Sequence, residues 1–172
     1  MRLNLNGLRA GRCAAAAAVL AISFGAALAA GKGGQAEWQQ DPSTGCRFIA
    51  PTSLTTAPTY WTGACVSGKA SGLGMLRTRV GAKAGIAFYG ELRDGVPLIG
   101  AVDFESGYQV GRFVDGDIGA HNTEWQEQHD GFEAALRAAR MVSKHYSNAG
   151  NTASARYYDR VAKQLDKQLD RD

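Results

Sequence analysis

The residues that could carry out chemistry are few, and most of them are not spaced as catalytic or metal-binding groups are. Asp103 and Glu105 alternate with apolar residues, so on a β-strand they would share one face and could serve as an acid–base pair. His121 lies in a predicted loop and is the histidine that we would test for function. No serine has a Gly-x-Ser-x-Gly context, and no histidines form an HExxH pair. We therefore predict a protein that is not an enzyme and that uses no metal or cofactor. The alternative is a cell-envelope enzyme or enzyme inhibitor with a site near Asp103, Glu105 and His121.

The cysteines predict a structural bond and no reactive pair. Cys13 lies in the N-terminal apolar run, which leaves Cys46 and Cys65 in the remaining chain. These two lack the CxxC spacing of redox and metal sites, and no histidine is near them. In an exported protein an even pair of this kind predicts a disulfide. Closing the loop would stabilise the fold by about 3 kcal/mol.

A short motif, Gly-x-apolar-x-x-Gly, occurs three times: at Gly63–Gly68, at Gly90–Gly95 and at Gly111–Gly116. In each copy the last glycine follows Ser or Asp, and Asp-Gly is a strong signal for a two-residue hairpin turn. The first glycine of each copy falls within a strand, where an aromatic side chain from a neighbouring hairpin can pack on its bare backbone. The motif therefore predicts stacked β-hairpins.

The stretch from Trp61 to Leu76 resembles the MORN repeat. Its consensus runs aromatic-x-Gly-x-apolar-x-x-Gly-x-x-x-Gly-x-Gly-x-apolar, and this stretch matches it at every named position. A second copy, starting at Phe88, lacks the later Gly-x-Gly pair, and a third has its aromatic residue, Tyr108, one place early. The uneven glycine spacing predicts an insertion near residues 77–85. The resemblance implies a string of twisted antiparallel hairpins, with roles in protein scaffolding and sometimes in contact with membrane lipids. A generic small β-sheet is the alternative.

The charges predict where a partner binds. From Arg47 to Lys83 the chain has five basic residues and no acidic one, whereas from Glu91 to Asp117 it has six acidic and two basic residues. In a linear array this predicts a charge dipole, hence head-to-tail self-association or a basic patch of Arg77, Arg79 and Lys83 facing an anionic envelope surface. We expect a protein partner. The predicted contact surface is made of aromatic and basic residues: Tyr60, Trp61, Arg77, Arg79, Tyr89 and Tyr108.

The N-terminus has the three parts of a secretory signal peptide. Arg2, Arg9 and Arg12 precede an apolar, alanine-rich run, and Ala27-Leu28-Ala29 fits the small-x-small cleavage rule. Cleavage after Ala29 predicts a periplasmic or secreted protein. It also removes three of the 19 basic residues, so the mature chain has 16 basic and 16 acidic residues. Net charge therefore does not support a nucleic-acid partner.

After residue 120 the apolar spacing changes to that of helices. Thr123 with Gln126 predicts an N-cap and capping box, and Asn151 or Thr152 is expected to begin a second helix. The fold class is thus predicted as α+β, a short array of antiparallel hairpins followed by a helical hairpin. The predicted parts are a signal peptide (1–29), a flexible lead-in (30–45), a MORN-like β-hairpin domain (46–120) and a helical hairpin (121–172).

Overall fold

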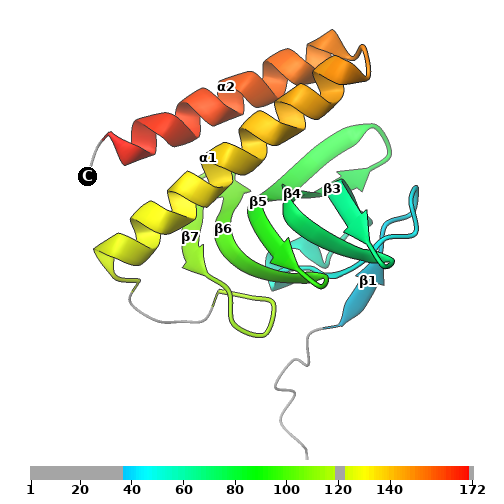
Figure 1. The fold of residues 1–172 in the computed structure, drawn as a ribbon, viewed down its shortest axis with the longest axis horizontal. Helices are drawn as coiled ribbons and strands as arrows, with labels where there is room; N and C mark the ends of the chain where they lie inside the picture. Colours follow the sequence, from blue (N-terminus) through cyan, green and yellow to red (C-terminus); the bar gives the residue numbers. More distant parts are fainter. Residues whose placement is uncertain (1–36, 119–122, 171–172) are drawn as a thin grey trace, which may run out of the picture. The chain divides into compact units, whose positions relative to one another are not determined.

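The computed structural model describes residues 37–118 and 123–170, so the predicted signal peptide and His121 lie outside the described residues. Within the described ranges, a seven-stranded sheet precedes two helices (Figure 1), which confirms the α+β fold class. The elements are β1 (Trp38–Gln40), β2 (Arg47–Ile49), a 3-10 turn η1 (Thr52–Leu54), β3 (Thr59–Val66), β4 (Lys69–Val80), β5 (Lys83–Arg93), β6 (Val96–Phe104), β7 (Gly107–Arg112), α1 (Trp125–Asn148) and α2 (Thr152–Leu169).

Strands β3 to β7 form an antiparallel meander in chain order. Strands β1 and β2 pair with each other and join the meander through one parallel contact, between Arg47 and Lys69. The predicted flexible lead-in is wrong over residues 38–45, because β1 lies there and the side chain of Asp41 is buried. The Asp41 carboxylate accepts a hydrogen bond from the backbone N–H of Trp61, which fixes this segment against β3.

The three repeated motifs form tight turns, as predicted. Ser67, Asp94 and Asp115 have φ angles of 50°, 50° and 53°, and the glycine after each of them also has a positive φ. Positive φ at both central residues is the geometry of a type I′ turn, which matches the twist of the two strands it joins. The spacing of the motif therefore determines where three of the chain reversals fall.

The first glycines of the three motifs lie, together with Gly74 and Gly100, in one row that crosses the sheet. Gly63 pairs with Gly74, Gly74 with Gly90, Gly90 with Gly100, and Gly100 with Gly111. Residues paired across strands present their side chains on the same face. The row is therefore a groove without side chains that runs across five strands.

Aromatic rings cover this groove at Gly63, Gly74, Gly90 and Gly100, whereas Gly111 lies against Thr123 and Glu127. The rings come from a position that differs from the prediction. The Trp61 ring lies over Gly63 and Gly74, where an added Cβ would come within 2.3 Å and 2.2 Å of ring atoms. The Phe88 ring lies over Gly90, at 2.5 Å from such a Cβ. Each ring belongs to the same strand as the first glycine it covers, two residues before it. The predicted donor, a neighbouring hairpin, is wrong.

The sheet has two covered faces. The face that we call the helix face carries Met75, Tyr89 and Ala101, which share a core with both helices. The opposite face, which we call the N-terminal face, carries the next row of side chains and packs on β2 and η1. Its buried apolar residues are Cys46, Phe48, Ala50, Leu54, Trp61, Ala70, Leu76, Phe88, Leu92, Val102 and Phe113. The sheet and the helical hairpin thus share one core and are not separate domains.

The disulfide between Cys46 and Cys65 is present, as predicted, with Cα atoms 5.9 Å apart. It joins the start of β2 to the end of β3. The N-terminal segment is therefore held to the sheet by a covalent bond as well as by the strand pairing described above.

The helical hairpin is confirmed, with one cap displaced. Asn151 caps α2 by accepting a hydrogen bond from Ser154, whereas the N-cap of α1 is Glu124, without a side-chain cap bond, so the prediction of Thr123 is wrong. Helix α1 packs closely on the sheet at Gly131, where a Cβ would lie 2.9 Å from the backbone nitrogen of Gly111. None of the described helices has the length and apolar character needed to cross a membrane.

Strands β4 and β5 extend beyond the glycine row as a long hairpin arm. Their register shifts between Arg77 and Arg79, and the strands then continue to the turn after Val80. This arm accounts for the insertion expected near residues 77–85. The bulge bends the arm locally, and the pocket described next lies beneath it.

Candidate ligand-binding pocket

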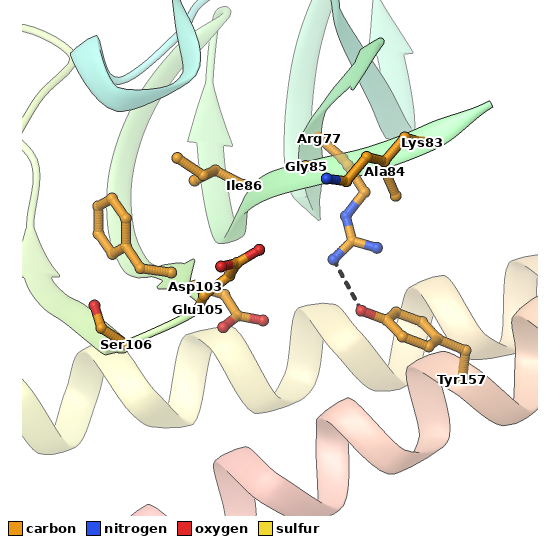
Figure 2. A pocket seen from close by; sticks show the side chains of 10 residues that line it. Arg77, Lys83, Ala84, Gly85, Ile86, Asp103, Glu105, Ser106 and Tyr157 are labelled. Atoms are coloured by element: carbon orange, nitrogen blue, oxygen red, sulfur yellow. Dashed lines mark hydrogen bonds between the residues drawn. The ribbon is translucent and has the colours of Figure 1, made fainter. Parts of the chain in front are cut away.

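A pocket of about 750 Å³ lies between the β4–β5 arm, the end of β6 and helix α2 (Figure 2). This volume is within the range of small-ligand sites. Charged residues of both signs line it, together with a tyrosine, a serine and several apolar residues. The lining residues are Arg77, Lys83, Ala84, Gly85, Ile86, Asp103, Phe104, Glu105, Ser106 and Tyr157.

Strand register places the central charged residues of the pocket. Arg77 pairs with Ala87, Ala87 with Asp103, and Asp103 with Tyr108, so the four occupy one row on the helix face. Arg77 and Asp103 are two strands apart, or about 10 Å between backbones. The residue between them in this row is Ala87, which is fully buried. The row therefore holds a cation and an anion apart.

The Arg77 side chain is held by tyrosine hydroxyls. It is only 5% exposed, and its guanidinium donates hydrogen bonds to the hydroxyls of Tyr89 (3.2 Å), Tyr157 (3.2 Å) and Tyr158 (3.5 Å). The guanidinium carbon also lies 5.2 Å from the centre of the Tyr157 ring and 5.5 Å from that of Tyr158, at cation–π distance. Burial lowers the pKa of Arg77, but its tyrosine neighbours raise it by more. Arg77 is thus a fixed cation.

No carboxylate neutralises Arg77 directly. Among residues 37–118 and 123–170, none lies within 4.0 Å of its guanidinium, and its Nε has no hydrogen-bond partner. Neutral hydroxyls and aromatic rings recover part of the hydration that a buried cation loses, but not as fully as an ion pair does. The cation at the edge of the pocket therefore favours an anion there.

Asp103 is the corresponding anion on the other side of the pocket. Loss of solvent raises the pKa of this half-buried carboxyl, and the attraction of Arg77 opposes the rise without cancelling it. Burial, with the charge of Asp103, also raises the pKa of Tyr108 to about 12. Lys83 and Glu105, by contrast, are exposed. The pocket therefore has a partly desolvated interior and a charged, solvated mouth.

The six residues predicted as one exposed contact surface do not form it. Trp61 is buried on the N-terminal face, whereas Tyr89 is buried on the helix face, so the prediction is wrong for both. Each is buried because it fills a core position of an inward-facing row. Arg77 is buried as well, which leaves Arg79 and Lys83 alone in the predicted basic patch.

The remaining predicted residues have separate environments. The Arg79 guanidinium stacks on the Tyr60 ring at 5.2 Å, and neither residue lines the pocket. Tyr108 packs edge-on against Phe132 of α1, with ring centres 5.7 Å apart. Of the residues in the alternative site, Asp103 and Glu105 both line the pocket, while His121 is outside the described residues.

Sequence reasoning missed Tyr157, the residue by which α2 contributes to the pocket. Tyr158 was predicted to lie on the buried stripe of α2, and it does. The adjacent Tyr157 falls beside that stripe and is 39% exposed. Two consecutive tyrosines at the border of an apolar stripe were the available signal, because the first is then free to turn toward the edge of the sheet.

Comparison with known protein families, characterised proteins and solved structures finds no match to this chain. The resemblance to MORN repeats therefore stays a prediction from the sequence.

Proposed function

We propose that the protein is an exported, non-enzymatic binding protein that acts in the periplasm or outside the cell. It would bind its partner by holding a carboxylate of that partner in the pocket at Arg77. Export is supported by the three-part N-terminal pattern, and the disulfide between Cys46 and Cys65 suits an oxidising compartment.

The observation that carries the proposal is the state of Arg77. It is buried, fixed in direction by tyrosine hydroxyls, and faces the pocket. Among the described residues, no carboxylate lies within 4.0 Å of its guanidinium. A preorganised guanidinium binds a carboxylate without first losing conformational freedom or breaking an internal ion pair. The carboxylate of a protein or peptide partner fits this requirement. This site replaces the exposed aromatic surface expected from the sequence.

The test is an NMR titration of the mature chain with sodium acetate at constant ionic strength. Backbone amides of the pocket lining should shift, and Arg77→Met should weaken acetate binding at least tenfold. Arg79→Met removes the same charge from a residue outside the lining and should bind acetate as the wild type does. Equal binding by a folded Arg77→Met variant would contradict the proposal. If that variant does not fold, Arg77→Lys keeps the charge but not the planar fork, and should still bind more weakly.

A second candidate is the enzyme considered in the sequence analysis, with Asp103 as a general acid or base. The raised pKa of Asp103 in a pocket is the observation that favours it, because such shifts are common in catalytic carboxyls. Turnover of chromogenic peptide or glycoside substrates by the wild type, abolished in Asp103→Asn, would support this second candidate. Binding of acetate without any turnover would favour the binding protein over the enzyme.

A further inference from the structure

The pocket has two walls of opposite charge that do not neutralise each other. Arg77 and Lys83 come from the β4–β5 arm, while Asp103 and Glu105 come from the end of β6 and the turn after it. Figure 2 shows the acidic side chains on one side of the space and Arg77 on the other. Among the described residues, no ion pair within 4.0 Å joins the two walls.

The backbone keeps the two walls apart. Asp103 is two strands away from Arg77, and Ala87, the buried residue between them, has no polar group that could bridge them. The guanidinium is also directed by its bonds to Tyr89 and Tyr157. The separation of charges is therefore a property of the folded sheet and does not depend on a flexible side chain.

This arrangement selects among ligand charges. A dianion attracted by Arg77 would bring its second negative charge toward Asp103 and Glu105. A simple cation attracted by Asp103 would approach Arg77 and Lys83. A ligand with a negative group at one end and a positive group at the other meets the opposite charge on both walls, and it would stabilise the desolvated Asp103 carboxylate as well.

We propose that the pocket binds a zwitterion that carries a free ammonium and a free carboxylate, as amino acids and short peptides do. The carboxylate would lie against Arg77 and Lys83, and the ammonium against Asp103 and Glu105. Ile86 and Phe104 also border the pocket, but both pack on the core of the N-terminal face, so the two charged walls dominate the recognition. This inference rests on the proposed function, because it adds a second requirement to the anion held at Arg77.

The test compares three forms of one dipeptide by the same NMR titration. Alanyl-alanine carries both charges, its N-acetyl form lacks the ammonium, and its C-terminal amide lacks the carboxylate. Each blocked form should bind at least tenfold more weakly than the free dipeptide. Asp103→Asn should reduce the preference for the free ammonium, while acetate still binds at Arg77. Asp166→Asn, which removes the same charge from an exposed pair with Arg140, should leave that preference unchanged.

The outcomes separate this inference from the proposed function. If the N-acetyl dipeptide binds as tightly as the free one, or if acetate binds and the dipeptide does not, the zwitterion is ruled out and anion binding stands. If neither acetate nor any dipeptide binds, both proposals fail. If Asp103→Asn does not fold, Glu105→Gln at the exposed turn takes its place, and an unchanged preference in that variant counts against the inference.

Discussion

Asp41 and Arg77 are two buried charges in the same small fold, and they are treated very differently. The Asp41 carboxylate, 2% exposed, accepts hydrogen bonds from the backbone N–H groups of Ser43 (2.7 Å), Thr44 (2.8 Å) and Trp61 (2.6 Å). Arg77, 5% exposed, has only neutral hydroxyls and rings around it, an Nε without a partner, and a pocket beside it.

The difference indicates which charge supports the structure and which is available to a ligand. Backbone amides are fixed partners, so the charge of Asp41 is already compensated when the chain has folded. The compensation of Arg77 is incomplete, so an arriving anion still gains by binding there. Under the proposed function, the charge of Asp41 stabilises the fold and that of Arg77 binds the ligand.

The largest effect is expected from removing the compensated charge of Asp41. Asp41→Ala removes three hydrogen bonds to a charged acceptor and leaves the buried N–H of Trp61 without a partner, so it should lower the free energy of unfolding by about 4 kcal/mol. Urea unfolding at pH 7 measures the loss. Asp166→Ala, in an exposed ion pair, should lose less than about 1 kcal/mol. Similar losses of unfolding free energy in the two variants would show that the hydrogen bonds of Asp41 do not make its charge more stabilising than an exposed one.

The next effect tests how tightly the N-terminal face of the sheet is packed. At Gly90 an added Cβ would lie 2.3 Å from the backbone oxygen of Ile99 as well as against the Phe88 ring. Gly90→Ala should therefore lower the free energy of unfolding by about 3 kcal/mol, the upper part of the range for overpacking. Gly68→Asn is the control, because nothing lies within 4 Å of that turn position and Asn tolerates positive φ. A neutral Gly90→Ala would show that the glycine row is not constrained by contact.

The smallest effect concerns Asp103 in the pocket, where a substitution should raise the stability instead of lowering it. Because burial raises the pKa of Asp103, the folded state holds a proton there that the unfolded state has already released. Stability should therefore fall as the pH rises from the ordinary range of an aspartate through this raised pKa. Asp103→Asn should melt at a higher temperature than the wild type at pH 7, and the gain should disappear in acid, where both carry a neutral group. A lower melting temperature at pH 7 would mean that attraction to Arg77 outweighs desolvation.

The parts of the fold that were predictable depend on local chemistry. Positive φ at Asp94 and Asp115 follows from the Asp-Gly dipeptides, the disulfide from the even cysteine count, and the cap at Asn151 from its place before an apolar stripe. The cap at Thr123 was wrong by one residue, because Thr123 and Glu124 both precede the helical pattern and only the final backbone angle decides between them.

The parts that were not predictable depend on distant partners. Asp41 lies in a stretch with a loop-like composition, and its role requires an amide 20 residues away in sequence. The pocket needs the pairing of Arg77, Ala87 and Asp103, which a shift of one residue in register would turn to the other face. It also needs Tyr157, whose direction depends on how α2 packs. Sequence spacing alone contains none of these distances.

The Cys46–Cys65 bond also determines how the molecule would bear a mechanical load. The two cysteines are 19 positions apart in the sequence, and the chain between them would measure about 65 Å if fully extended. Pulling on the two ends of the oxidised chain cannot lengthen that segment. Tension would pass from the start of β2 to the end of β3 through the disulfide, so the backbone of η1 between the two cysteines is not stretched until the bond itself breaks.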